Sequence, residues 1–120
     1  MRVLIADEQQ KSRFALRLLL EREQELSVVG EAEDVGVLMT QIKISHPDMV
    51  LLDWELPNTN GENALCSIRK VYPNVAVIVL SGRPEAKKAA LSAGANAFIS
   101  KGDPPERLLA EVANFDRRCR

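Results

Sequence analysis

Four ionisable side chains in this chain each stand where a short apolar run ends. They are Asp7, Glu8, Asp53 and Lys101. Carboxylates that crowd together repel one another, and some would protonate unless a cation joined them. Carboxylate oxygens are hard ligands that suit Mg²⁺, with a backbone carbonyl and water completing the coordination shell. The spacing therefore predicts an assembled site that handles a phosphoryl group rather than scattered surface charge.

The residue types are those needed to form an aspartyl phosphate. Asp53 would attack phosphorus in line, while Mg²⁺ and Lys101 neutralise charge on the equatorial oxygens. Ser81 ends a further apolar run, 77–80, and adds a hydroxyl to the same set. Taken singly, each residue has a plainer interpretation, because acids and serines often cap helices and lysines are usually solvated. The prediction depends on their occurring together at strand ends.

Five strands are expected, separated by stretches with helical periodicity. The expected strands are 2–6, 26–30, 49–52, 75–80 and 97–100. Strict alternation of strand and helix indicates an α/β doubly wound fold with a parallel sheet. The strands are continuously apolar, which is typical of strands covered on both faces. In such a sheet the carboxyl ends of all strands meet at one edge, where ligands bind.

The helical stretches carry recognisable faces and ends. Phe14, Leu18 and Leu19 mark the apolar face expected for the first helix. Asp34 is expected to cap the second helix, and Gly94 is expected to end the fourth.

Length and composition place the chain among ordinary globular domains. Its 120 residues suit one domain, which we expect over 1–116, with 117–120 as a C-terminal tail or the start of a linker. The formal net charge of −1 gives no reason to expect direct binding to nucleic acid or membranes. The two cysteines, Cys66 and Cys119, are interpreted as reduced thiols. Without a signal peptide or an apolar span, the sequence predicts a cytoplasmic location.

This ordered set of residues resembles the receiver domain of bacterial two-component response regulators. The resemblance runs from Val3 to about Phe115, and the segment 81–101 is most similar to the NarL/LuxR subgroup. It implies a flavodoxin-like (βα)5 fold whose five-stranded parallel sheet has the order 2-1-3-4-5. One departure is Gly102, which stands where the family often has a proline in a cis peptide.

The resemblance also implies a role for each site residue. Asp53 would be phosphorylated by a sensor histidine kinase. Asp7 or Glu8, together with Asp53 and the backbone carbonyl of Glu55, would hold Mg²⁺. Lys101 would bind the phosphoryl group and take part in its transfer.

A second group of residues would convert phosphorylation into a signal. Ser81 would turn toward the phosphoryl group and Phe98 would follow by rotating inward, which reshapes the face of the fourth helix, fifth strand and fifth helix. Glu55 and Arg83 occupy positions that influence the hydrolysis rate in this family. We expect these two side chains to pair over the site and change water access, against the alternative of a weak exposed ion pair.

The expected function is a signalling switch, not an enzyme acting on an external substrate, although the chain would assist its own phosphorylation and dephosphorylation. The expected output is transcription through a C-terminal DNA-binding domain absent from this chain, with a homodimer as a further expectation on phosphorylation. The chain could be a stand-alone receiver or, as we favour, an isolated domain.

The alternative function is that of a degenerate receiver that docks proteins without phosphorylation. An FMN-binding flavodoxin fits poorly, because acids replace its phosphate-binding loop, and a haloacid-dehalogenase-like phosphatase has its nucleophile after the first strand.

Overall fold

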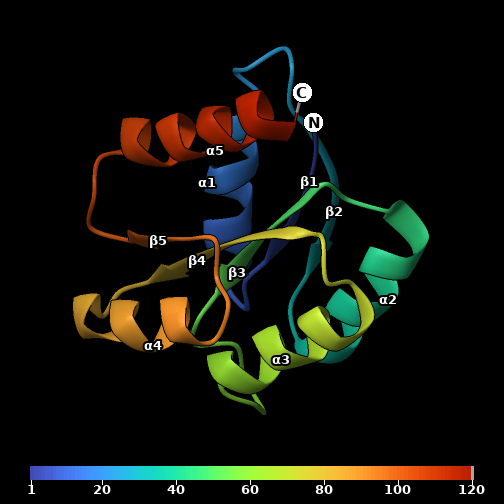
Figure 1. Ribbon diagram of the computed structural model, residues 1–120. Helices are drawn as coiled ribbons and strands as arrows, with labels where there is room; N and C mark the ends of the chain where they lie inside the picture. Colours follow the sequence, from blue (N-terminus) through green and yellow to red (C-terminus); the bar gives the residue numbers. More distant parts are fainter. Residues whose placement is uncertain (120) are drawn as a thin grey trace.

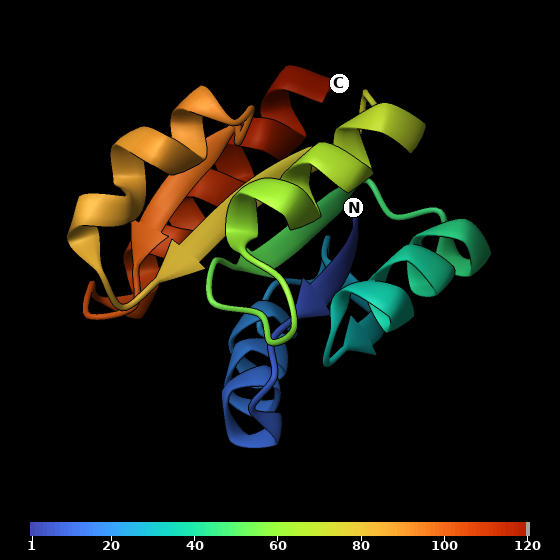
Figure 2. The same ribbon diagram turned by 90° about the horizontal axis from the view of Figure 1, so that it is seen from below.

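A single parallel sheet organises the computed structural model, which describes residues 1–119. Its five strands are β1 (Arg2–Ala6), β2 (Ser27–Ala32), β3 (Met49–Asp53), β4 (Ala76–Ser81) and β5 (Ala97–Ser100). Their order is β2-β1-β3-β4-β5, and every neighbouring pair is parallel. The predicted fold class and strand order are therefore confirmed. The arrowheads of the strands point toward the same edge of the sheet (Figure 2).

Helices cover both faces of the sheet. They are α1 (Gln10–Leu20), α2 (Val35–Ser45), α3 (Gly61–Val71), α4 (Lys87–Ser92), which follows a 3₁₀ turn at Pro84–Ala86, and α5 (Pro105–Cys119). Helices α1 and α5 lie on one face, and α2, α3 and α4 lie on the other (Figures 1 and 2). The helical backbone of α5 runs past residue 116, where we placed the domain boundary, and that boundary stays a prediction. Arg120, in the expected tail, lies outside the described residues.

The core consists of two apolar layers separated by the sheet. Every residue of β3 and β4 is buried. Successive side chains of a strand point to opposite faces, so Val50 and Leu52 pack toward α2 and α3, while Met49 and Leu51 pack toward α1 and α5. Burial on both faces explains why these strands are continuously apolar in the sequence.

Short polar residues begin and end the helices as their chemistry suggests. The Oδ1 atom of Asp34 accepts a hydrogen bond from the Val37 amide at 2.9 Å, which confirms the predicted cap of α2. Asn60 caps α3 in the same way through the Asn63 amide at 2.8 Å. After α4, Gly94 takes a φ of 108°, a left-handed conformation that glycine adopts without a steric penalty, so the predicted end of this helix is also confirmed.

The predicted apolar face of α1 is wrong in part. Phe14 is 60% exposed and Leu18 is 51% exposed, whereas Leu20 is fully buried. Leu16 and Leu19 provide the remaining contacts with the core layer on this side. Apolar residues occupy more than half the circumference of α1, so periodicity alone does not say which stripe faces the sheet.

The end of β2 was also predicted too early. The strand continues two residues past Gly30, because Glu31 and Ala32 pair with Ile5 and Ala6 of β1. This extension brings Glu31, a charged residue, to the edge of the sheet where β1 ends.

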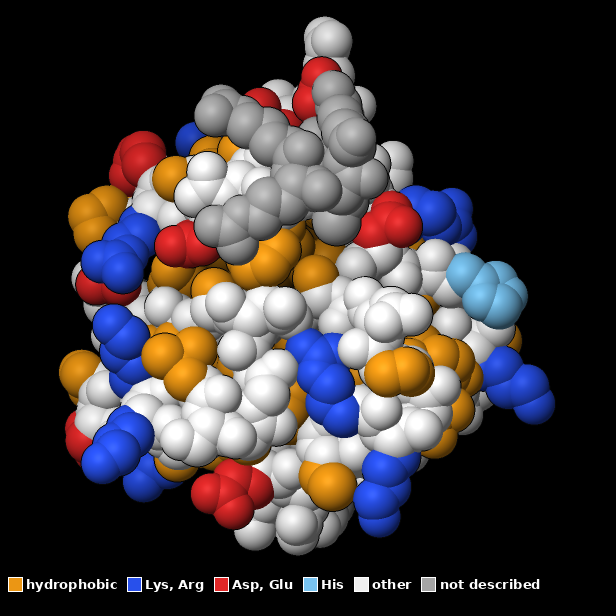
Figure 3. All heavy atoms as spheres, viewed as in Figure 1, with side chains coloured by type: hydrophobic (Ala, Val, Ile, Leu, Met, Phe, Trp, Pro, Cys, Tyr) orange, Lys and Arg blue, Asp and Glu red, His pale blue; other side chains and the backbone are white. Residues whose placement is uncertain are grey.

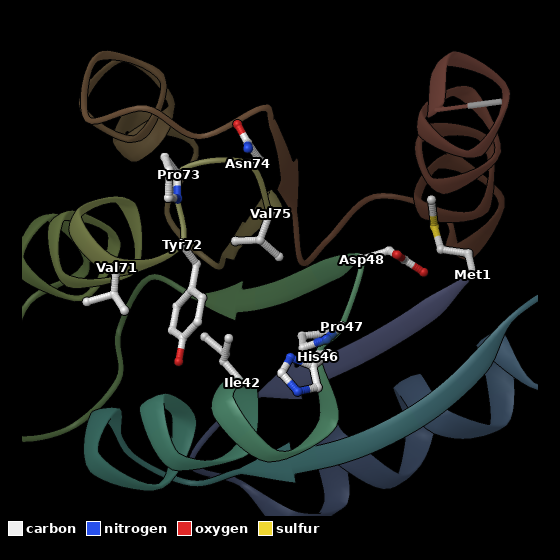
Figure 4. Close-up of a pocket in the computed structure, with 10 residues that line it drawn as sticks. All are labelled: Met1, Ile42, His46, Pro47, Asp48, Val71, Tyr72, Pro73, Asn74 and Val75. Atoms are coloured by element: carbon white, nitrogen blue, oxygen red, sulfur yellow. The ribbon is translucent and has the colours of Figure 1, made fainter.

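Charged side chains of both signs are interspersed over the surface seen in Figure 3. No helix among residues 1–119 combines the length and apolar character needed to cross a bilayer. A hollow of about 720 Å³ lies at the edge of the sheet opposite the strands' carboxyl ends. Figure 4 shows His46 and Tyr72 among the residues that line it, at the ends of α2 and α3. None of the predicted site residues lies there.

Candidate functional site

Three of the predicted site residues meet at the carboxyl edge of the sheet. The ammonium nitrogen of Lys101 lies 3.2 Å from Asp53 Oδ2 and 3.4 Å from Asp7 Oδ2. Asp7 is 1% exposed and Asp53 is 5% exposed, whereas the lysine side chain is 36% exposed. One partly solvated cation thus joins two buried carboxylates that lie 46 positions apart in the sequence.

Backbone hydrogen bonds between neighbouring strands hold these residues in place. The Asp7 amide donates to Ala32 O at 2.9 Å, and the Lys101 amide donates to Ser81 O at 2.8 Å. Asp53 is itself the last residue of β3. A turn then holds the segment after Lys101, because the Asp103 amide donates to Ser100 O at 3.0 Å. The sheet therefore fixes the backbone of all three residues.

The electrostatics of the cluster favour a further cation. Burial raises the pKa of Asp53, and the nearby Asp7 charge adds to this, against the opposing effects of the Glu55 amide and Lys101. Burial lowers the pKa of Lys101, but the two carboxylates outweigh burial and hold it above its ordinary value. Two carboxylates share one ammonium group, so the cluster carries an excess negative charge in a poorly solvated place.

The donor set fits a hard divalent cation such as Mg²⁺. Asp7 and Asp53 present carboxylate oxygens at the same edge, and the backbone carbonyl of Glu55 follows two residues after Asp53. Oxygen donors of this kind, completed by water, are those that Mg²⁺ prefers. A dication would also compensate the excess negative charge that the lysine leaves.

Glu8 stands apart from this cluster. The residue is exposed, and among the described residues its carboxylate makes no hydrogen bond or ion pair. Within residues 1–119, no group of three or more His, Cys, Asp or Glu side chains is gathered closely enough to hold a metal ion. The carboxylates of Asp7 and Asp53 are therefore the acidic pair that the structure brings together, and a role for Glu8 stays a prediction.

Ser81 lies in the site but faces Glu55 rather than Asp53. Its hydroxyl donates to the Glu55 carboxylate, 3.0 Å from each oxygen, and accepts a hydrogen bond from the Arg83 amide at 3.0 Å. The Arg83 guanidinium approaches the same carboxylate at 3.7 Å. The predicted pair of Glu55 and Arg83 is present, with side chains 39% and 59% exposed respectively. An effect of this pair on hydrolysis stays a prediction.

Phe98 lies on β5, beside Val79 of β4. It is 8% exposed and belongs to the core layer that includes Ala86 and Ala90. The ring is thus already buried, and any movement in a switch would begin from this position. Its role as a switch residue stays a prediction.

The packing of Trp54 explains why residue 61, at the start of α3, is a glycine. The indole is 7% exposed and covers Gly61, the first residue of α3. A Cβ atom at residue 61 would come within 2.2 Å of the indole ring. Close packing, not backbone conformation, therefore requires glycine here, and it leaves a single fluorescent reporter next to Asp53.

Two residues of α1 support the site and were missed from the sequence. The Ser12 hydroxyl donates to Asp7 Oδ2 at 2.6 Å. The Arg13 guanidinium donates to the backbone carbonyl oxygens of Asp7 and Glu8, at 2.6 and 3.1 Å, and to Glu31 Oε1 at 3.0 Å. Their positions, five and six residues after Asp7, place them within the first turn of a helix that starts after the acidic loop. That spacing was the one available signal.

Glu31 in turn is held by two arginines. Arg17 donates to its Oε2 atom at 2.6 Å, while Arg13 binds Oε1. Burial acts to raise the pKa of Glu31, but the hydrogen bonds and charges of Arg17 and Arg13 outweigh it and lower the pKa overall. This network ties α1 to β2 beside the loop that carries Asp7.

Comparison with known families gives a match over most of the chain. A family model described as the response regulator receiver domain matches residues 3–113. The matched range contains all of the site residues described above.

Curated relatives match over a similar range. The Fimbriae Z protein of Escherichia coli strain K12 is 32% identical over 101 residues, which cover 82% of this chain and 48% of that protein. The transcriptional regulatory protein YhcZ of Bacillus subtilis is 32% identical over 111 residues, covering 91% and 52%. A protein-glutamate methylesterase/protein-glutamine glutaminase of Pyrococcus abyssi is 39% identical over 104 residues, covering 83% and 28%. The chain spans about half the length of the first two and less of the third.

Solved structures share the fold. A LuxR-family two-component response regulator from Aurantimonas has a TM-score of 0.89 at 27% identity, covering 95% of this chain and 83% of that one. The isolated receiver domain of RcsB from Salmonella enterica, determined with the phosphomimetic BeF₃⁻, has a TM-score of 0.90 at 25% identity, covering 98% and 88%. A CheY-like receiver domain protein from Methanospirillum hungatei has a TM-score of 0.81 at 28% identity, covering 94% and 90%.

Proposed function

The chain belongs to the response regulator receiver domain family, and on that premise we propose that Asp53 accepts a phosphoryl group and so switches the domain. The observation that carries the proposal is the contact of one ammonium group, that of Lys101, with the two buried carboxylates of Asp7 and Asp53. A structural ion pair would need only one carboxylate. The second leaves excess negative charge, which suits a site that receives a cation together with a phosphoryl donor.

The proposed transfer is an in-line displacement at phosphorus. A carboxylate oxygen of Asp53 forms the new bond to phosphorus as the bond to the donor's leaving group breaks, and the leaving group keeps the electron pair. With phosphohistidine as donor, the bond that breaks is P–N. Lys101 already contacts Asp53, so its ammonium group is close enough to stabilise the negative charge that develops on the phosphoryl oxygens.

Asp7, Asp53 and the Glu55 carbonyl would hold Mg²⁺. When bound, Mg²⁺ would supply charge neutralisation on the phosphoryl oxygens. Of the residues themselves, Asp7 is the one whose position is most tightly set, since Ser12 and the Gln9 amide each donate to its carboxylate. A carboxylate fixed in this way needs little rearrangement to accept a cation.

Loss of the phosphoryl group would occur by attack of water on phosphorus, which returns Asp53 to a carboxylate and releases phosphate. We propose that the exposed pair of Glu55 and Arg83 limits the access of that water. The support for this is its position, because Glu55 also donates its amide to Asp53 Oδ1 at 3.0 Å. The domain would thus contribute to its own dephosphorylation without acting on an external substrate.

The partners follow from this role. We propose a sensor histidine kinase as phosphoryl donor and, as output, transcription through a DNA-binding segment outside the present chain, with a homodimer on phosphorylation. LuxR-family and transcriptional regulatory proteins among the similar proteins support this proposal. The chain also spans about half the length of the curated regulators it matches.

The proposal is tested by the intact mass of the protein after incubation with acetyl phosphate and Mg²⁺. We expect one added phosphoryl group, which is absent in Asp53→Asn and when the metal is removed with a chelator. Asp103→Asn is a matched control, because it removes another carboxylate at the same edge that does not contact Lys101. An adduct that survives in Asp53→Asn would contradict the assignment of the acceptor. No adduct in the wild type would favour a docking module that works without phosphorylation.

A further inference from the structure

The hydroxyl proton of Ser81 is already used in this structure. A serine hydroxyl has a single proton to donate, and that of Ser81 points between the two carboxylate oxygens of Glu55, 3.0 Å from each. The serine is fully buried, so solvent does not supply a competing partner. To donate to a phosphoryl group on Asp53, the hydroxyl must first leave Glu55.

We propose that Glu55 is a latch that holds Ser81 in the unphosphorylated arrangement and so sets how readily the domain switches. This proposal rests on the proposed function, because it assumes that a phosphoryl group on Asp53 is the competing acceptor. It differs from control of hydrolysis by the pair of Glu55 and Arg83, since it concerns the equilibrium between two arrangements of Ser81.

Glu55 contacts both the proposed phosphoryl acceptor, Asp53, and the hydroxyl of Ser81. The Glu55 amide donates to Asp53 Oδ1 at 3.0 Å, while its carboxylate accepts from Ser81. A phosphoryl group on Asp53 brings negative charge next to the negative Glu55 carboxylate. Like charges repel, so the event that creates a new acceptor for Ser81 also weakens the old one.

The geometry allows the latch to open without disturbing the core. The Glu55 side chain is 39% exposed, so its carboxylate has solvent to enter once it leaves Ser81. The Arg83 guanidinium, 3.7 Å away and 59% exposed, offers an alternative partner on the solvent side. The Arg83 amide remains hydrogen-bonded to Ser81 Oγ only while the hydroxyl keeps its present position.

The test is a double-mutant cycle on the affinity for beryllofluoride in the presence of Mg²⁺, measured by Trp54 fluorescence. Removing one charge-assisted hydrogen bond that competes with the ligand should tighten binding about five- to tenfold in Glu55→Ala. The Ser81→Ala protein has no hydroxyl for Glu55 to bind. Adding Glu55→Ala to it should therefore change the beryllofluoride affinity by about twofold at most. The Glu55 amide and carbonyl are retained in every variant.

Glu85→Ala is the matched control for charge. It removes an exposed carboxylate from the 3₁₀ turn at Pro84–Ala86, shortly after Ser81, and Glu85 has no hydrogen bond to Ser81 among the described residues. We expect its affinity to match that of the wild type. Equal tightening by Glu55→Ala in the wild-type and Ser81→Ala backgrounds would overturn the latch, because repulsion of the anion alone would then account for it. Unchanged affinity in Glu55→Ala would overturn it as well.

A second measurement needs no ligand and keeps failure of the latch distinct from failure of the proposed function. Three-bond Hα–Hβ coupling constants report the χ1 rotamer of Ser81 in the free protein. We expect one rotamer in the wild type and in Glu85→Ala, and rotamer averaging in Glu55→Ala. A single unchanged rotamer in Glu55→Ala would refute the latch even if phosphorylation of Asp53 is established. If beryllofluoride and acetyl phosphate both fail on the wild type, the proposed function fails, and rotamer averaging would still show that Glu55 holds Ser81.

Discussion

The two sides of the site differ in how firmly they are held. On the side of β1 and α1, Asp7 is 1% exposed, its carboxylate accepts hydrogen bonds from Gln9 and Ser12, and Arg13 binds the carbonyl oxygens of its loop. On the side of β3 and β4, the Glu55 carboxylate is held by the Ser81 hydroxyl and a 3.7 Å contact with Arg83. The Asp7 carboxylate on the first side is buried and multiply bonded, whereas the Glu55 carboxylate on the second side is partly exposed.

This difference separates two tasks. A cation and a phosphoryl group need carboxylates and an ammonium group fixed in advance, since each rearrangement during transfer costs rate. A signal needs a part that changes position when charge arrives, and such parts are drawn from weakly held segments. Lys101 stands between the two, because it bonds to the fixed Asp7 and to the reacting Asp53.

The largest expected effect comes from removing the central cation. In Lys101→Ala, the rate at which acetyl phosphate modifies Asp53 should fall about 100-fold, because the ammonium group that contacts Asp53 is lost. The time course of the intact mass measures this rate. Lys43→Ala removes an exposed lysine of α2 and should react as the wild type does. A rate within twofold of the wild type in Lys101→Ala would remove this residue from the transfer.

Mg²⁺ binding on the Asp7 side of the site should weaken when a supporting residue of α1 is removed. We expect Arg13→Ala to weaken Mg²⁺ binding about tenfold, the usual size of an effect transmitted through a neighbour of a metal ligand. Mg²⁺ titration followed by Trp54 fluorescence measures the affinity. Arg17→Ala is the matched control, since it also pairs with Glu31 but makes no hydrogen bond to the acidic loop. Equal losses in the two variants would assign the effect to Glu31 pairing instead.

Asp53 should lower the stability of the empty domain at neutral pH. Burial raises its pKa, so between the ordinary value of 3.8 and the raised value the folded state binds more protons than the unfolded chain. Stability therefore falls as pH rises through this window, and the full penalty remains above it. We expect Asp53→Asn to raise the free energy of unfolding at pH 7 by roughly 1 kcal/mol. Urea denaturation without Mg²⁺ measures the gain, which should vanish near pH 3.8. A gain independent of pH would contradict this explanation.

The smallest effect is expected on the exposed side. Arg83→Glu replaces an attraction to Glu55 by a repulsion, which should open the approach to Asp53 and shorten the lifetime of the phosphorylated protein by about threefold. The decay of the phosphorylated mass after removal of acetyl phosphate measures the lifetime. Lys87→Glu makes the same charge change at an exposed position of α4. An unchanged lifetime in Arg83→Glu would end the water-access hypothesis.

The fold and the fixed cluster could be predicted because they depend on strong and local signals. The buried strands β3 and β4 are continuously apolar, and parallel topology brings their ends to one edge. Asp53 and Lys101 could therefore be placed together from their positions after apolar runs. The sequence marks the ends of strands less sharply, and β2 extends two residues beyond its predicted end.

The rest depends on details that a sequence pattern does not contain. The apolar residues of α1 surround much of the helix, so Phe14 and Leu18 were assigned to the core although they are exposed. The contact between Ser81 and Glu55 joins side chains 26 residues apart and depends on their rotamers. Arg13 acts through backbone carbonyl oxygens, which every residue has, so no residue type marks its targets.

The central claim is that Asp53 is the phosphoryl acceptor, and its most direct test is chemical identification of the modified residue. Sodium borohydride reduces an aspartyl phosphate to homoserine, which peptide mass spectrometry locates in the sequence. After treatment with acetyl phosphate and Mg²⁺, we predict homoserine at residue 53 and unchanged aspartate at residue 7. Homoserine at residue 7, or an adduct that leaves no homoserine at residue 53, would contradict the account.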